Sequence, residues 1–164
     1  MIDPTLWLRQ RLRTMQIIAL VLGGGATLTT AVMIGLRAND PAPAVVEPTL
    51  SYVALVVGAI QIAASLMAPA LMENGAFKRL ATMSEPSPQR LVDVYQVRLI
   101  VSLALLESAV IFGAIAFRLE GQTWALTPCL IGIALMGLKL PTELNLSAWV
   151  DAAGRRVQEM REQP

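Results

Sequence analysis

Histidine is absent from this sequence, and cysteine occurs only once, at Cys129. These absences exclude a histidine-containing zinc site, a Ser-His-Asp triad and a Cys-His pair, and they leave no partner for an intrachain disulfide. Cys129 is expected to be a small buried apolar residue. We therefore predict that the chain is not an enzyme and holds no metal and no cofactor.

Charged residues are also scarce. Lys, Arg, Asp and Glu make up 15% of the 164 residues, against 55% hydrophobic residues, and the net charge is only +1. The mean hydropathy of +0.58 is far above that of an ordinary soluble domain. This composition predicts an integral membrane protein whose partner is the lipid bilayer, and it gives no reason to expect nucleic-acid binding.

Long apolar stretches are present, and four of them have roughly the 20 residues that a membrane crossing needs. They cover about 15–36, 50–72, 99–117 and 123–140. The first exceeds the roughly 7 to 15 apolar residues of a signal peptide, so we interpret it as a retained span. We predict an all-α protein with a single membrane domain over 1–164, in which four transmembrane helices form an antiparallel bundle.

The segment 143–161 is expected to form a C-terminal amphipathic helix. Its charged residues lie mostly opposite a set of apolar residues at helical spacing, namely Leu146, Trp149, Val150, Ala153, Val157 and Met160. Two placements fit this pattern. The helix lies on the inner membrane surface, or it packs under the bundle or against a second copy.

Lysine and arginine are distributed unevenly between the connections. All except Arg37 and Arg118 lie in the N-terminal tail, in the connection 73–97 or directly after it at Arg98, or at and after the end of the fourth stretch. The positive-inside rule then places both termini and the 73–97 connection in the cytoplasm, as in a bacterial-type plasma membrane. The residues expected at the membrane interface are Trp7, Arg9, Arg11, Arg13, Arg155 and Arg156.

Small residues within the spans predict close helix contacts, because they let two backbones approach each other in lipid. The glycines expected to serve this purpose are Gly23, Gly24, Gly25, Gly58 and Gly113. Because the outer connections are short, we expect the first span to lie beside the second and the third beside the fourth.

One acidic residue interrupts the third apolar stretch. Glu107 lies nine residues after Arg98 and eleven before Arg118. At about 1.5 Å per residue the two arginines are roughly 30 Å apart, the thickness of the hydrocarbon core, so Glu107 is expected near the midplane. A charge at that depth costs about 2.5 to 3.5 kcal/mol on insertion scales, and such groups usually mark function.

Neutral polar residues are expected at the same depth as this carboxyl. Gln61 lies near the centre of the second stretch, and Ser108 follows Glu107 directly. Two interpretations stay open for such a group. It is a hydrogen-bonded knot that holds spans together, or it is a small binding site for H⁺ or Na⁺.

Two motifs in the second and third stretches resemble a known family. "ALLESAVIFG" at 104–113 is similar to the A-x-x-E-[ST]-x-x-I-Y-G pattern of the c subunit (proteolipid) of rotary ATPases, and "GAIQIAAS" at 58–65 to the glutamine-containing stretch of its sodium-binding members. The resemblance covers 55–117 and implies that Gln61, Glu107 and Ser108 ligate Na⁺ or hold a proton. Phe112 stands where the family has tyrosine, and the family's inner-helix glycine repeat is missing.

These features favour a small membrane protein whose midplane carboxyl binds or passes H⁺ or Na⁺, as a homo-oligomer or a subunit of a membrane complex. The alternative is a membrane scaffold or accessory subunit in which Glu107 is a packing knot. A third interpretation, binding of lipid or a small amphiphile between spans, draws on the basic inner rim that includes Arg155 and Arg156.

Overall fold

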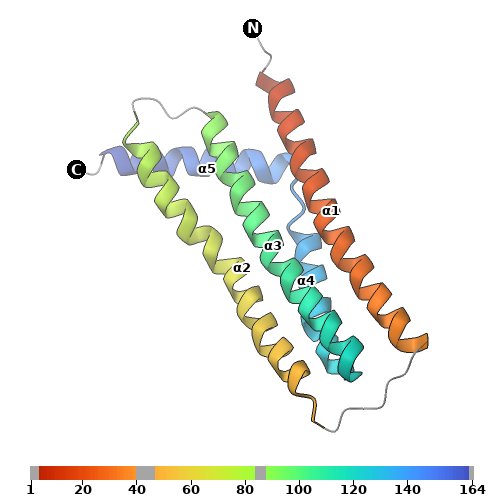
Figure 1. Ribbon diagram of the computed structural model, residues 1–164. Helices are drawn as coiled ribbons and strands as arrows, with labels where there is room; N and C mark the ends of the chain where they lie inside the picture. Colours follow the sequence, from red (N-terminus) through yellow and green to blue (C-terminus); the bar gives the residue numbers. More distant parts are fainter. Residues whose placement is uncertain (1–3, 40–46, 84–87, 163–164) are drawn as a thin grey trace.

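The computed structural model describes residues 4–39, 47–83 and 88–162, and the regular structure in these ranges is entirely helical (Figure 1). This confirms the all-α prediction. In chain order the elements are α1 (Pro4–Asn39), α2 (Thr49–Ala81), α3 (Pro88–Glu120), the short 3₁₀ helix η1 (Thr123–Leu126), α4 (Thr127–Leu138) and α5 (Glu143–Glu162). Helices α1 to α4 run alternately up and down, and α5 crosses the end of the bundle near which the chain begins (Figure 1).

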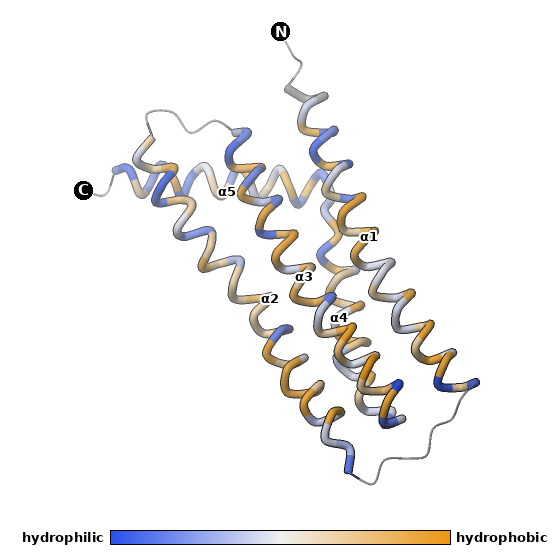
Figure 2. The backbone as a smooth tube through the Cα atoms, viewed as in Figure 1, coloured by the Kyte–Doolittle hydropathy of each residue, from blue (hydrophilic) through white to orange (hydrophobic). Residues whose placement is uncertain are grey.

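Helices α1, α2 and α3 are long and apolar enough to cross a membrane. They contain 36, 33 and 33 residues. At about 1.5 Å per residue each is roughly 50 Å long, well beyond a hydrocarbon core of about 30 Å. Hydrophobic residues occupy the middle of these helices, and hydrophilic residues gather toward their ends (Figure 2).

The expected connection over 73–97 is therefore too wide, because 73–81 and 88–97 are helical. The physical reason is that hydropathy reports where lipid covers a chain, whereas the backbone hydrogen bonds of a helix continue into water without needing apolar side chains. Each of the first three apolar stretches is part of a longer helix.

The fourth apolar stretch does not form one long helix. At the end of α3, Gly121 adopts a φ of 73°, and its N–H donates to the carbonyl of Phe117 at 2.8 Å, which closes the helix. η1 and α4 then return along α3 as far as Leu138, and α5 follows at an angle of 79°. Within the described residues only the three longer helices are sufficient on their own to span a membrane.

Helix α3 lies at the centre of the bundle, between α1, α2 and α4 (Figure 1). Half of its most apolar stretch is buried, compared with 17% for α1 and 22% for α2. Within the described ranges α1 makes no contact with α2, so the expectation that the first two spans are neighbours is wrong, whereas the third and fourth stretches do pack together. Nine residues separate α1 from α2, and they reach up to about 30 Å, which is more than a helix diameter of about 10 to 12 Å.

Glycines allow close contacts between α4 and its neighbours. A Cβ built on Gly113 of α3 would lie 2.8 Å from the Sγ of Cys129, and one on Gly58 of α2 would lie 2.7 Å from the Cβ of Pro128. Cys129 is fully buried, and its Sγ lies 3.1 Å from the carbonyl oxygen of Val110. At both positions an added Cβ would be too close to α4, so the absence of a side chain lets α4 pack there.

The glycines of α1 behave differently. A Cβ on Gly23 or Gly24 would meet no heavy atom of another described element within 4 Å, and one on Gly25 would meet only the Oε1 of Glu107, at 3.8 Å. Among the described residues Gly23 and Gly24 therefore make no close contact with another helix of the same chain, and their expected role in close packing stays a prediction. They line an open groove between α1 and α4.

Helix α5 packs against the ends of α2 and α3 through its apolar side. Ala153 and Val157 are buried in a cluster with Phe77 and Leu80 of α2, and Leu146 is buried in the main core. Of the two placements considered from the sequence, packing under the bundle is the one observed. A position at the membrane surface stays a prediction.

Candidate functional site

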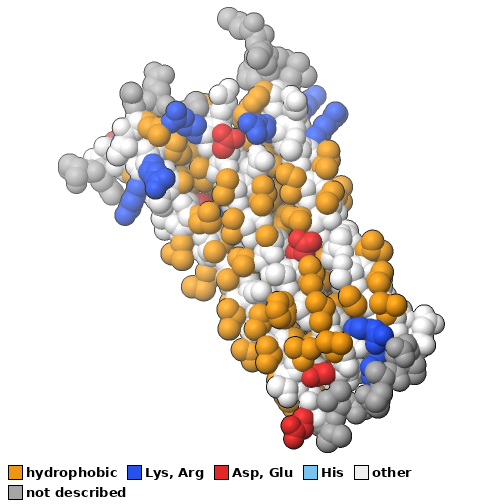
Figure 3. All heavy atoms as spheres, viewed as in Figure 1, with side chains coloured by type: hydrophobic (Ala, Val, Ile, Leu, Met, Phe, Trp, Pro, Cys, Tyr) orange, Lys and Arg blue, Asp and Glu red, His pale blue; other side chains and the backbone are white. Residues whose placement is uncertain are grey.

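Glu107 lies in the apolar middle of α3, on the side that faces α1. Its side chain is half-buried, and its Oε1 lies 3.8 Å from the position that a Cβ on Gly25 would take. Within the described ranges no group donates a hydrogen bond to this carboxyl or pairs with its charge. Hydrophobic side chains cover the middle of the face seen in Figure 3, and the cations lie toward its two ends.

Gln61 and Ser108 do not converge on Glu107. The hydroxyl of Ser108 donates to the carbonyl of Leu105 in its own helix at 2.9 Å. Gln61 belongs to α2, which does not touch α1, and its Oε1 is buried without a hydrogen-bond donor among the described residues. The three residues therefore do not form one ligand set within a single chain.

The predicted interface residues at the N-terminal end of α1 take part in tertiary contacts. Arg11 lies 3.5 Å from Asp93 and 3.4 Å from the amide oxygen of Gln96, and its guanidinium is 6.0 Å from the centre of the Trp7 ring. The Trp7 ring is half-buried against the main core. Arg9 forms a largely exposed ion pair with Glu143 at 3.4 Å. Arg13, Arg155 and Arg156 are exposed.

A second polar site, which the sequence analysis missed, surrounds a proline in α2. Pro69 has no N–H to donate to the carbonyl of Ser65, which lies four residues earlier. That carbonyl instead accepts a hydrogen bond from the hydroxyl of Ser102 on α3 at 2.8 Å and one from the ammonium of Lys139 at 3.0 Å. The ammonium also donates to the Ser102 hydroxyl. The signal that could have found this site is the proline within an apolar span.

An ion pair lies close to this cluster, on the side of α5. The guanidinium of Arg98 on α3 contacts the Oε1 of Glu73 on α2 at 2.6 Å. The indole N–H of Trp149 on α5 donates to the same oxygen at 3.2 Å. The Trp149 ring packs against the rings of Tyr95 at 5.2 Å and Phe77 at 6.0 Å. Three helices are thereby joined at one carboxylate, whose side chain is only 9% exposed.

The opposite end of the bundle has its own carboxylate contact. Glu120, the last residue of α3, accepts hydrogen bonds from the backbone N–H groups of Leu50 and Ser51, each at 2.7 Å. These groups belong to the first turn of α2, which has no side-chain cap of its own. The acidic side chain satisfies two of the free N–H groups and lies at the positive end of the helix dipole.

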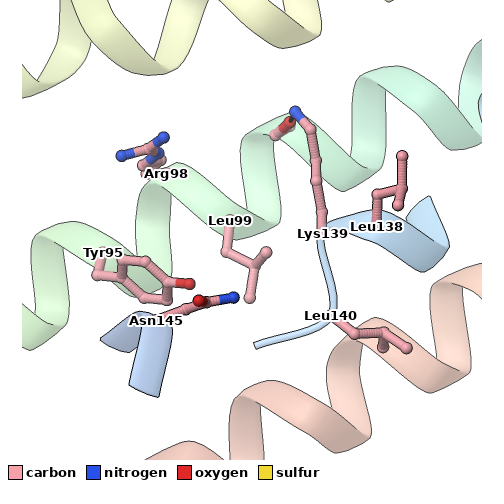
Figure 4. A pocket seen from close by; sticks show the side chains of 8 residues that line it. Tyr95, Arg98, Leu99, Leu138, Lys139, Leu140 and Asn145 are labelled. Atoms are coloured by element: carbon pink, nitrogen blue, oxygen red, sulfur yellow. Dashed lines mark hydrogen bonds between the residues drawn. The ribbon is translucent and has the colours of Figure 1, made fainter. Parts of the chain in front are cut away.

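Side chains around the end of α4 line a cavity of about 160 Å³ (Figure 4). Lys139 reaches across from the end of α4 to α3, and the hydroxyl of Tyr95 points toward Asn145 (Figure 4). The remaining lining residues are Arg98, Leu99, Ser102, Leu138 and Leu140. Two cations and no acid therefore line this cavity.

Comparisons with known protein families, with curated proteins and with solved structures gave no match for this chain. The likeness of 55–117 to the c subunit of rotary ATPases thus stays a prediction. In the part of the chain that the structure describes, no three Cys, Asp or Glu side chains come together in a group able to hold a metal ion.

Proposed function

We propose that this chain is an integral membrane protein in which Glu107 takes up and releases a proton within the membrane. The observation that carries the proposal is the position of this carboxyl, half-buried in the apolar middle of α3 with no hydrogen bond and no charge partner among the described residues. A lone carboxyl can be neutralised by a proton without any further ligand, so a proton is the simplest ion for it to carry.

A proton fits the site better than Na⁺ does. A bound Na⁺ needs several oxygen ligands together, as in transporters where backbone carbonyls coordinate it. What supports this choice is that the Ser108 hydroxyl is bonded within its own helix and the Oε1 of Gln61 has no hydrogen-bond partner among the described residues, so neither is bonded to Glu107. A single carboxyl is sufficient for H⁺, and a Na⁺ site would require atoms from a second copy.

The membrane topology that accompanies this proposal has four crossings, the fourth made by η1 and α4. At about 2.0 Å per residue for η1 and 1.5 Å for α4, their 16 residues extend roughly 26 Å, slightly less than the hydrocarbon core of about 30 Å. The glycine contacts of α4 hold it along α3. With four crossings both termini lie on one side, and the positive-inside rule makes that side the cytoplasm.

The alternative function is a scaffold or accessory subunit, in which Glu107 bonds a polar group of another chain. It is favoured by a second unpartnered atom, the buried Oε1 of Gln61. A homo-oligomer or a larger membrane complex could supply partners to such polar groups, which have none among the described residues. In this case Glu107 has a packing role and no proton is exchanged.

Labelling with a hydrophobic carbodiimide separates the two functions, because this reagent modifies protonated carboxyls in apolar surroundings. In purified membranes we expect the reagent to modify Glu107. Glu107→Gln should abolish the labelling and also the proton uptake of proteoliposomes. The matched control is Asp93→Asn, which removes an acid at the end of the same helix.

The outcomes of this experiment are distinct. Labelling that falls when Na⁺ is added indicates a Na⁺ site formed between copies. An inert Glu107, together with unchanged proton uptake in Glu107→Gln, contradicts the proposal and favours the scaffold.

Cysteine accessibility tests the topology separately. In a Cys129→Ser background, a cysteine at exposed Asn39 should react with an impermeant maleimide added outside intact cells, and one at exposed Gln158 should react only after the cells are opened. If both cysteines react from outside, the fourth crossing is wrong.

A further inference from the structure

The cavity at the end of α4 has the composition of an anion site. Arg98 and Lys139 both line it, together with the polar side chains of Tyr95, Ser102 and Asn145, and no acid is among its lining residues. Its volume of about 160 Å³ is roughly ten times the 10 to 15 Å³ that one buried water needs, so it has room for a small oxyanion.

The two cations differ in how far their charge is already neutralised. Arg98 contacts the Glu73 carboxylate at 2.6 Å. Lys139 has no carboxylate partner within the described ranges, and its ammonium donates to the Ser65 carbonyl and the Ser102 hydroxyl only. An ammonium has three N–H donors, so one is left for a ligand. The cavity therefore keeps a net positive charge.

An apolar groove begins beside the cavity. Leu140 lines both the cavity and the groove between α1 and α4, whose volume is about 520 Å³. The groove extends along α1 from Ala19 to Ala31. At about 1.5 Å per residue this is roughly 18 Å, close to the thickness of one leaflet of a hydrocarbon core of about 30 Å. Its open wall is formed by Gly23, Gly24 and Gly137, where a Cβ would meet nothing of another element within 4 Å.

We propose that this composite site binds an anionic phospholipid, with its phosphate in the cavity at Arg98 and Lys139 and an acyl chain in the glycine-lined groove. Basic pockets between membrane helices on the cytoplasmic side are suited to anionic headgroups. A zwitterionic headgroup fits less well, because its own cation would lie near Lys139. The site does not depend on Glu107, so it stands independently of the proton proposal.

Native mass spectrometry of the full chain, purified in detergent and mixed with lipids of equal acyl length, tests this site. The wild-type protein should retain phosphatidylglycerol in preference to phosphatidylcholine. Lys139→Gln should lower that preference about fivefold, which corresponds to about 1 kcal/mol per basic residue near an anionic lipid. Lys78→Gln is the matched control, because Lys78 is the other lysine of the chain and is exposed. Lys139→Arg should restore the preference.

The groove is tested by filling it. Gly24→Leu should lower retention of both lipids, and Gly35→Leu, on the same helix and also in open space, should change nothing because Gly35 does not line the groove. Inorganic phosphate is the competitor that separates a free anion from a lipid. It should displace little lipid, since it cannot occupy the groove.

Three results would overturn the proposal. The first is equal lipid preference in Lys139→Gln and Lys78→Gln, compared at equal helix content. The second is full lipid retention in Gly24→Leu, which tests the site even if Lys139→Gln does not fold. The third is complete displacement of phosphatidylglycerol by inorganic phosphate, which would identify a free-anion site instead.

Discussion

Two faces of α3 carry polar side chains, and their surroundings differ. On the face toward α2 and α4, Ser102 and Arg98 are joined to Ser65, Lys139 and Glu73 by hydrogen bonds and an ion pair. On the face toward α1, the carboxyl of Glu107 lies beside Gly25 and has no hydrogen bond or ion pair among the described residues. The first set has its partners inside the chain and so contributes to stability. The second lacks them, which makes it the candidate for exchange with a proton or another molecule.

The largest effect that tests this comparison is expected from Glu73→Ala. Removing one member of a buried ion pair leaves an unpaired charge and costs about 3 to 5 kcal/mol. We expect the low end, about 3 kcal/mol, because the Arg98 side chain is 40% exposed. The free energy of unfolding in detergent measures it. Glu73→Gln, which keeps an acceptor for Trp149, should lose less, and an unchanged value for Glu73→Ala would contradict the comparison.

A matched pair of glycines compares the packing of the two faces. Gly113→Ala places a Cβ 2.8 Å from the carbonyl oxygen of Ala125 and from the Sγ of Cys129. Overpacking of this kind costs about 1 to 3 kcal/mol, so we expect a loss of about 2 kcal/mol. Gly25→Ala adds a Cβ at an ordinary contact distance and should gain about 0.5 to 1 kcal/mol from helix propensity. Equal effects on unfolding would show that the two faces pack alike.

Substitution of two serines of α3 compares a hydrogen bond between helices with one inside a helix. Ser102→Ala removes the bond to the Ser65 carbonyl and an acceptor for Lys139, and it should destabilise the protein by about 1 kcal/mol. Ser108→Ala removes only a bond to the carbonyl of Leu105 in the same helix and should change the free energy of unfolding by less than about 0.5 kcal/mol. A larger loss of stability for Ser108→Ala than for Ser102→Ala would contradict the comparison, because it would mean that the stabilising contacts lie on the face toward α1.

The smallest effect on stability is expected from Glu107→Gln. Because no described residue is bonded to this carboxyl, the variant should unfold within about 0.5 kcal/mol of the wild type. The same unfolding measurement made on the purified monomer and on any oligomer gives a sharper comparison. A clear loss seen only in the oligomer would identify a partner group on another chain.

Much of the fold was predictable from hydropathy, because long apolar runs specify helices wherever lipid is the solvent. The apolar stripe of α5 also predicted its helix, and Ala153 and Val157 are buried as its spacing suggests. The order of the helices in the bundle was not predictable. Chain connectivity favours neighbours, but the nine residues between α1 and α2 allow α3 to lie between them.

The two polar sites also differ in whether the sequence could predict them. Glu107 could be identified from the sequence alone, because an acidic residue within an apolar stretch is unusual whatever surrounds it in the fold. The contacts of Lys139 depend on how α2, α3 and α4 are aligned with one another. No single stretch of sequence carries that information. Pro69 was the available signal, since a proline in a helix always frees the carbonyl four residues before it.

The contact of Glu120 with the first turn of α2 has a consequence for biosynthesis. Its bond to Leu50 joins residues 70 positions apart, so the start of α2 leaves the ribosome long before its cap is made. Until then two backbone N–H groups in the first turn of α2 lack this acceptor. The bond to α2 forms only when the last turn of α3 arrives on the same side. The α2–α3 pair is thus closed at this end only after the whole of α3 has been synthesised.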